Sequence, residues 1–399
     1  MKRALEGLNS EKRVEQQRLA SVLVLKELAT NAPTLFYMHV PAFLKTIWAG
    51  IGDIKQMIRE AAIENLRACL FLISERDSSV RTKWYMEVFE ESNRRLRSGQ
   101  LEVLHGALLA AGELLRINVG ILSEDKVADV YNLVVRQKDN KDSLIRRTVI
   151  NLLPMLARFN PEQFCECYLT DSFNHLIMIL RKGSERSSPF LALGAIVSIA
   201  GQRARPWLDD IVELIDDGIV PKSRKPHCYE AVTCLASVAE ALPDDPTLLV
   251  RAPMLLEQMF SGTGGRLDPR MVSAISDVAR SMPSLLPDIQ LRLLDAVSFI
   301  LQMTPYQPSG TPKNRRIAPF RSQTIGPGDD TFERHQAVIQ ALQALCRLCS
   351  PEPDTLVCAS RAIASATLSE CLENMIRMRF VPCAKDTLHA TLSESYSPT

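Results

Sequence analysis

The chain has 399 residues, and its 47 lysines and arginines nearly balance its 46 aspartates and glutamates, which leaves a formal net charge of +1. This balance provides no global field to attract nucleic acid or an anionic membrane, so neither is predicted as a partner. The ten cysteines are scattered and often stand beside apolar residues, which is typical of buried thiols in a reducing compartment and predicts a cytoplasmic protein without a disulfide framework.

The N-terminus lacks the features of a targeting segment. Residues 1–6 hold no apolar core followed by a small-residue cleavage site, so we expect no signal peptide. The chain also opens without a capping residue or turn, as if inside a helix, and we therefore expect a fragment of a longer protein. The longest apolar stretches, such as Leu191–Ala200, are too short for a membrane span and suit a buried helix, so direct membrane insertion is not predicted.

Apolar stripes of helix length follow one another along the chain, separated by residues that break helices. Almost nothing alternates with a period of two, so the sequence predicts no sheet. In chain order the stripes lie at residues 19–28, 41–49, 58–72, 104–117, 127–135, 145–159, 173–180, 190–200, 211–215, 229–242, 272–282, 291–303 and 338–349, with breakers at 31–33, 50–53, 160–161, 205–206, 243–246, 283 and 287.

One helical unit recurs within this series, a turn with an acidic or polar residue followed by an apolar stripe. The two clearest copies consist of Asp53, Ile58, Arg59, Ala62 and Leu66, and of Asp142, Ile145, Arg146, Val149, Leu152 and Leu156. Such a stripe occupies one face of a helix, and a single helix pair cannot bury it alone. The repetition therefore predicts an all-α solenoid of antiparallel helix pairs over residues 1–303.

Two stretches interrupt the pattern. Residues 77–100 carry Trp84, Tyr85 and Phe89 among charges, which indicates either a longer connection or an exposed helix with aromatic anchors. Residues 304–331 are rich in proline, glycine and arginine and hold too few apolar residues to offset the entropy of ordering them, so we expect a disordered loop. Thr304 and Thr311 each precede a proline, and phosphorylation there is a hypothesis.

Three separated blocks, Arg18–Glu91, Val103–Ile117 and Asp142–Phe164, resemble in the same order the N-terminal HEAT-repeat region of the target of rapamycin (TOR) serine/threonine kinases. The resemblance extends over Met1–Glu373, more loosely beyond Gly201, and makes residues 332–373 a further helical repeat. It implies that the solenoid is a HEAT-repeat (ARM-like) α-solenoid. It also implies a helical scaffold and protein-protein interaction arm in nutrient and growth signalling. Implied partners are a Raptor-like subunit and a second TOR chain. The implied location is cytoplasmic, with endomembrane surfaces reached through the complex.

The tail at residues 374–399 departs from that family. Where another repeat of acidic and alanine-rich character is expected, the sequence has Pro382 and Pro398, and we expect an irregular tail. It is either a divergent end or the product of a gene model that left the true reading frame. The rapamycin-binding segment and the kinase domain of the family lie outside the region that this chain resembles.

No catalytic, cofactor-binding or metal-binding residues are assigned. A protein kinase needs a glycine-rich cover over the phosphates and a metal-binding Asp-Phe-Gly motif, and the sequence contains no Asp-Phe-Gly. Gly262, Gly264 and Gly265 complete neither a Walker A loop nor a dinucleotide fingerprint and indicate a turn. We therefore predict that this chain is not an enzyme by itself, whatever the parent kinase does.

The remaining candidates favour structural roles. Cys346 and Cys349 extend an apolar stripe and lack a second close pair for zinc, with Cys358, Cys371, Cys383 and His389 as the other conceivable ligands; Cys165 and Cys167 have the same core interpretation. His105 and His175 are interpreted as turn or core residues. The acidic residues Asp209, Asp210, Asp216 and Asp217 flank a short apolar helix and are interpreted as a solvated face.

Basic residues provide the last candidates. Residues 222–225 and the arginines of the 304–331 loop lack interleaved aromatics and favour solvated or partner-facing loops over nucleic-acid binding. Arg59 and Arg146 are expected to form a structural ladder by bonding across to the acidic side chain of an adjoining turn. Which residues contact a partner stays unknown. The alternative function is an independent HEAT-repeat adaptor of the karyopherin or phosphatase-scaffold type, although karyopherins are usually more acidic than this chain.

Overall fold

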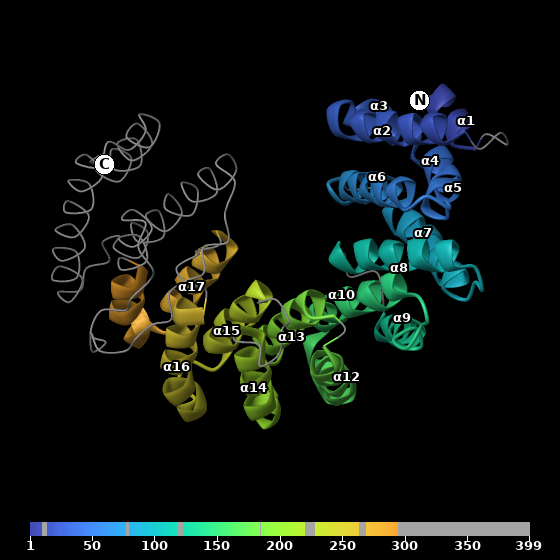
Figure 1. Cartoon of the computed structure of the whole chain (residues 1–399). Helices are drawn as coiled ribbons and strands as arrows, with labels where there is room; N and C mark the ends of the chain where they lie inside the picture. The colour runs from blue at the N-terminus through green and yellow to red at the C-terminus, as the bar shows by residue number, and fades with distance from the viewer. Residues whose placement is uncertain are drawn as a thin grey trace, which may run out of the picture. The chain divides into compact units, whose positions relative to one another are not determined.

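The computed structural model describes residues 1–9, 14–76, 80–117, 123–183, 185–219, 228–262 and 269–293 (Figure 1). Throughout these ranges the regular secondary structure is helical, and no strand occurs in them. The chain divides into two compact units, Met1–Ser172 and Phe173–Thr399. The predicted all-α solenoid of helix pairs is confirmed for the described part of the chain.

Unit 1 stacks its helices in two layers (Figure 1). In the first layer α2, α6, α8 and α10 contact one another in succession, and in the second layer α5 and α7 pack against α6 and α8 while α9 packs against α10. The helices are α1 (Lys2–Leu8), α2 (Glu15–Asn31), α3 (Pro33–Tyr37), α4 (Val40–Thr46), α5 (Trp48–Ile51), α6 (Gln56–Ser74), α7 (Arg81–Leu96), α8 (Leu101–Arg116), α9 (Glu124–Val135), α10 (Ser143–Phe159) and α11 (Pro161–Cys167).

The predicted stripes form the contact between these layers. In α6, Ile58, Ala62 and Leu66 are fully buried, as the recurring unit predicts. The second copy of the unit begins where Asp142 caps α10, because its carboxylate accepts hydrogen bonds from the backbone N–H groups of Leu144 at 2.8 Å and Ile145 at 3.2 Å. A capping carboxylate and a single apolar face therefore set the start and the orientation of this helix.

Side-chain pairs fix the register between α6 and α8. The Arg59–His105 and Arg67–Glu113 pairs are both 46 residues apart in sequence, so the two helices run parallel. The helix between them, α7, connects to α8 by residues 97–100 and therefore runs antiparallel to it. A close backbone approach helps to set the spacing, because a Cβ atom on Gly106 of α8 would lie 1.9 Å from the carbonyl oxygen of Ile51.

Unit 2 repeats this arrangement with α13, α15 and α17 contacting in succession and α14 packed against both α15 and α16 (Figure 1). Gly201 adopts a φ of 54°, a left-handed conformation that ends α13. A helical segment also starts at residue 286. The elements are α12 (Leu169–Lys182), which begins in unit 1, α13 (Ser187–Ala200), η1 (Gly201–Trp207), α14 (Leu208–Ile219), α15 (Tyr229–Ala241), α16 (Pro246–Gly262), α17 (Pro269–Ser281) and η2 (Pro283–Leu285).

Within the interruption predicted at residues 77–100, residues 81–96 form α7, which is a core helix rather than an exposed one. Helix α7 buries Trp84, Tyr85 and Phe89, and the Tyr85 hydroxyl donates a hydrogen bond to the carbonyl of Leu70 at 2.8 Å. The ring of Trp84 packs edge-on against Tyr37, with 5.3 Å between the ring centroids. The charged residues suggested an exposed segment, but they occupy the face of the same helix that is opposite to the buried aromatic residues.

Helix α16 has no counterpart among the predicted stripes. It contains Pro253, and apolar residues stand on both its buried and its exposed faces, so no single stripe appears in the sequence. The predicted segments 304–331, 332–373 and 374–399 lie outside the described residues, as do residues 294–303 of the predicted solenoid. These boundaries stay predictions. Among the described helices, none combines the length and the apolar character that crossing a bilayer requires.

Candidate functional site

A buried polar cluster at the start of α6 contains two of the residues that the sequence singles out. Arg59 is 5% exposed, and its Nη1 atom donates to the backbone carbonyl oxygens of Asp53 at 2.7 Å and Ile54 at 2.9 Å. Its Nε atom donates to Nδ1 of His105 on α8 at 3.0 Å. The guanidinium therefore joins the turn before its own helix to the next helix of the stack.

The expected ladder exists, but other arginines form it. The carboxylate of Asp53 pairs with Arg18 of α2, and it also accepts a hydrogen bond from the backbone N–H of Lys55 at 2.8 Å. In unit 2, Asp245 pairs in the same way with Arg205. The expectation that Arg59 bonds to an acidic side chain is therefore wrong, because the Asp53 carboxylate pairs with Arg18 of α2 and Arg59 donates instead to backbone oxygens and to His105.

Arg146 repeats the geometry of Arg59 at the start of α10. Its Nη1 atom donates to the carbonyl oxygens of Asn140 at 2.7 Å and Lys141 at 2.8 Å, which again lie six and five residues before the arginine. Arg146 is only half-buried, whereas Arg59 is enclosed. Both arginines therefore hold the turn that precedes their own helix, and the expected bond from Arg146 to an acidic side chain is not what forms.

His105 is a structural acceptor rather than an acid-base group. It is 3% exposed, and Nδ1 receives the Arg59 hydrogen bond, so the neutral ring carries its proton on Nε2. Burial, followed by the positive charge of Arg59, lowers the pKa of His105 to about 4. The predicted core role of His105 is thereby confirmed, and His175 is buried as well.

The four acidic residues near position 210 do not form a catalytic pair. The sequence predicted that they flank a short apolar helix, whereas the structure places all four within α14. All four are exposed or half-exposed. Asp210 pairs with Arg181 of α12 at 2.6 Å, and Asp217 pairs with Arg186 at 3.2 Å. A shared proton between two carboxylates needs two acids in contact, whereas each of these two faces a different arginine.

The cysteines divide between core and surface. Cys69 and Cys234 are buried, and burial raises the pKa of the Cys234 thiol to about 12, so neither side chain is a thiolate at neutral pH. Cys165 is half-buried and Cys167 is exposed, so the core interpretation is wrong for Cys167, which ends the short helix α11. Within the described ranges no cluster of three or more potential metal ligands occurs, and Cys346 lies outside them.

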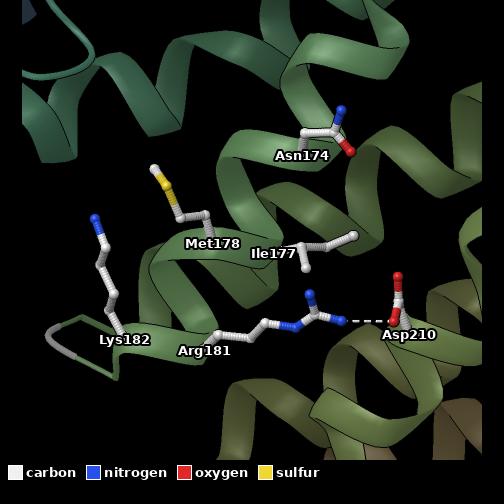
Figure 2. Close-up of a pocket in the computed structure, with 6 residues that line it drawn as sticks. All are labelled: Asn174, Ile177, Met178, Arg181, Lys182 and Asp210. Carbon is white, nitrogen blue, oxygen red and sulfur yellow. Dashed lines mark hydrogen bonds and ion pairs between the residues drawn. The ribbon is translucent and has the colours of Figure 1, made fainter.

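A surface pocket with a volume of about 400 Å³ lies between α12 and α14, and no motif in the sequence indicates it (Figure 2). Figure 2 shows Arg181 reaching across to Asp210 along one side, while Lys182 points away from that pair. The lining residues are Asn174, Ile177, Met178, Arg181, Lys182 and Asp210. The lining combines apolar side chains with charged ones, and it lacks the convergent buried polar groups that are typical of a cofactor site. Met178, one of the lining residues, is 39% exposed, and that exposure is visible only in the structure.

Two further candidates fall partly or wholly outside the described residues. Gly262 ends α16, while Gly264 and Gly265 are beyond the description, as is the basic segment 222–225. The described surroundings of these candidates therefore add no phosphate cradle and no basic stripe to the site.

No family model matches the chain. Among known proteins it is similar to the serine/threonine-protein kinase TOR of Arabidopsis thaliana, with 37% identity over 350 residues, which is 87% of this chain and 14% of that protein. The corresponding rice protein is 38% identical over 77% of the chain, and tor1 of Schizosaccharomyces pombe is 34% identical over 75%. The chain is homologous to one segment of the TOR serine/threonine kinases.

The segment shared with TOR is short compared with the whole relatives. The chain spans 14% of the Arabidopsis protein, 12% of the rice protein and 13% of the fission yeast protein. The resemblance to the helical-repeat region of TOR that the three sequence blocks carried is confirmed. Among solved structures, an engineered protein covers all of the chain at 12% identity with a TM-score of 0.34, a likeness too low to carry any argument.

Proposed function

We propose that the chain is a non-catalytic scaffold of a TOR-type serine/threonine kinase that acts in nutrient and growth signalling. The observation that carries this proposal is the homology itself, which covers 87% of the chain but only 14% of the Arabidopsis kinase. The described polar residues support it, because the hydrogen bonds and ion pair of Arg59, His105 and Asp53 connect neighbouring helices and turns. A phosphoryl-transfer site instead needs donors and metal ligands that face a substrate.

The scaffold would work through its surface. A stack of helix pairs contacts only its neighbours along the chain, so it presents a long face to other proteins and fixes the distance to a remote catalytic domain. By homology the proposed partners are a Raptor-like subunit and a second TOR chain. We propose a cytoplasmic location, with endomembrane surfaces reached through the assembled complex.

Co-purification tests the scaffold role. The tagged chain is mixed with the Raptor-like protein of the same organism, and a karyopherin cargo serves as the competing partner for the adaptor alternative. Retention of the Raptor-like protein alone is the expected result. Retention of the cargo alone would favour the independent adaptor of karyopherin or phosphatase-scaffold type.

The non-catalytic role needs a separate measurement. Purified chain should neither hydrolyse ATP nor phosphorylate a protein substrate, because its sequence contains no Asp-Phe-Gly to hold the metal ion. Turnover is followed through successive chromatography steps to separate it from contaminating kinases. Saturable activity that stays with the chain and disappears on substitution of one of its residues would contradict the proposal.

A further inference from the structure

Helix α16 carries a second apolar stripe that faces solvent. Leu249, Val250 and Met254 are 46%, 67% and 55% exposed, and they recur at spacings of one, four and five residues along one side of the helix. Pro246 and Pro253 are exposed on the same side. The opposite side provides the core contact through Leu248, Ala252, Leu255, Leu256 and Met259. A helix that is apolar on both faces has one face left for a neighbour.

The adjoining helix α14 carries a row of carboxylates on its solvent side. Asp209 and Glu213 are exposed and Asp216 is half-exposed, four and three residues apart along the helix. None of these three forms an ion pair with a described residue, in contrast to Asp210 and Asp217. Their negative charge is therefore available to a molecule that approaches this face.

The two rows form one surface because α14 and α16 pack side by side (Figure 1). Packed helices have axes about 8–10 Å apart, so a single helix laid along this surface would reach both rows. We name the set Leu249, Val250, Met254, Asp209, Glu213 and Asp216 the α14–α16 surface. Its composition is an apolar strip with an acidic border.

We propose that the α14–α16 surface docks a basic amphipathic helix of a partner protein. Apolar side chains of that helix at i, i+3 and i+4 spacing would cover Val250 and Met254, and lysines or arginines along its edge would pair with Asp209 and Glu213. This inference rests on the scaffold function proposed above and names the chemistry of one partner. Charge complementarity decides the occupant, since electrostatic matching selects partners and orients them.

The same charges argue against other occupants. An anionic membrane or a nucleic acid would be repelled by the three free carboxylates. In a dimer formed through this surface, the partner copy would offer a single exposed cation of α16, Arg251, to the three carboxylates. One cation is too few to balance them. A basic amphipathic helix can cover the apolar row with its apolar side and pair its cations with the acidic row.

The binding test uses the full chain and an 18-residue fluorescent peptide of leucine and lysine in amphipathic helical order. The comparison peptide has glutamate in place of each lysine. Fluorescence anisotropy is measured for the chain, for the Val250→Ser/Met254→Ser variant and for the Asp209→Asn/Glu213→Gln variant. The matched control variant is Ile54→Ser/Met57→Ser, because Ile54 and Met57 are 63% and 54% exposed and lie in unit 1.

The basic peptide should bind more tightly than the acidic one, and the apolar variant should weaken it about tenfold, since two exposed side chains lose most of their contact. The carboxamide variant should weaken it several-fold and reduce the salt dependence of binding. Equal binding by all four proteins, or equal binding of the two peptides, would overturn the proposal. Concentration-dependent dimers that the Val250→Ser/Met254→Ser variant abolishes would assign the surface to a second copy instead.

Failure of this proposal can be told apart from failure of the scaffold function. The same variants are carried through the co-purification with the Raptor-like protein. Retained co-purification without selective peptide binding would overturn the α14–α16 surface alone. Unchanged circular dichroism and thermal midpoints should show that these substitutions of exposed residues leave the fold intact.

Discussion

Replacing Arg59 by alanine tests whether the buried cluster holds the helical stack together. The substitution removes the three hydrogen bonds that Arg59 donates, to the carbonyl oxygens of Asp53 and Ile54 and to Nδ1 of His105. A buried acceptor left without a donor costs about 1–3 kcal/mol, and water entering the vacated space recovers part of that. We expect Arg59→Ala to lower the free energy of unfolding by about 3–5 kcal/mol.

Arg146→Ala is the matched control, because Arg146 makes the equivalent bonds to Asn140 and Lys141 from a half-buried position. Water can replace that guanidinium, so the expected loss is about 1 kcal/mol. Urea unfolding followed by far-ultraviolet circular dichroism gives both values, and proton NMR gives the His105 pKa, which should rise in Arg59→Ala since the arginine charge lowers it. Equal losses in the two variants, or an unchanged His105 pKa, would refute the reasoning.

Other expectations concern single side chains. Urea unfolding should show that Gly106→Ala destabilises the chain by about 2 kcal/mol more than Gly112→Ala in the same helix. The new Cβ atom at position 106 would lie 1.9 Å from a backbone oxygen, whereas the one at position 112 would lie 2.8 Å from the end of the Leu152 side chain. His105 has a folded pKa of about 4 against 6.5 unfolded, so its contribution to stability is complete above pH 6.5 and is lost as the pH falls toward 4; His105→Gln should flatten that part of the stability profile. Peptide mapping after maleimide treatment of the folded chain should find Cys167 labelled and Cys69 protected, and the reverse order would contradict their exposures.

The helical class, the stacking and the family resemblance could be predicted from the sequence. Stripes such as Ile58, Ala62 and Leu66 define a face that only a neighbouring helix can bury, and that face does not depend on which neighbour arrives. Asp142 could likewise be recognised as a helix start, since its cap bonds reach only two and three residues along the chain. These features are local and have a fixed spacing.

The pairing of charged residues was decided by the tertiary structure. Arg59 stands near Asp53 in sequence, yet the Asp53 carboxylate pairs with Arg18, which is 35 residues away. The Nε–H group of Arg59 donates its hydrogen bond to His105, which is 46 residues away. Those separations depend on how far one helix slides along the next, and no local pattern encodes that distance. The exposed apolar stripe of α16 has the same origin, because its two faces look alike in sequence and only the position of α14 and the core determines which face remains in solvent.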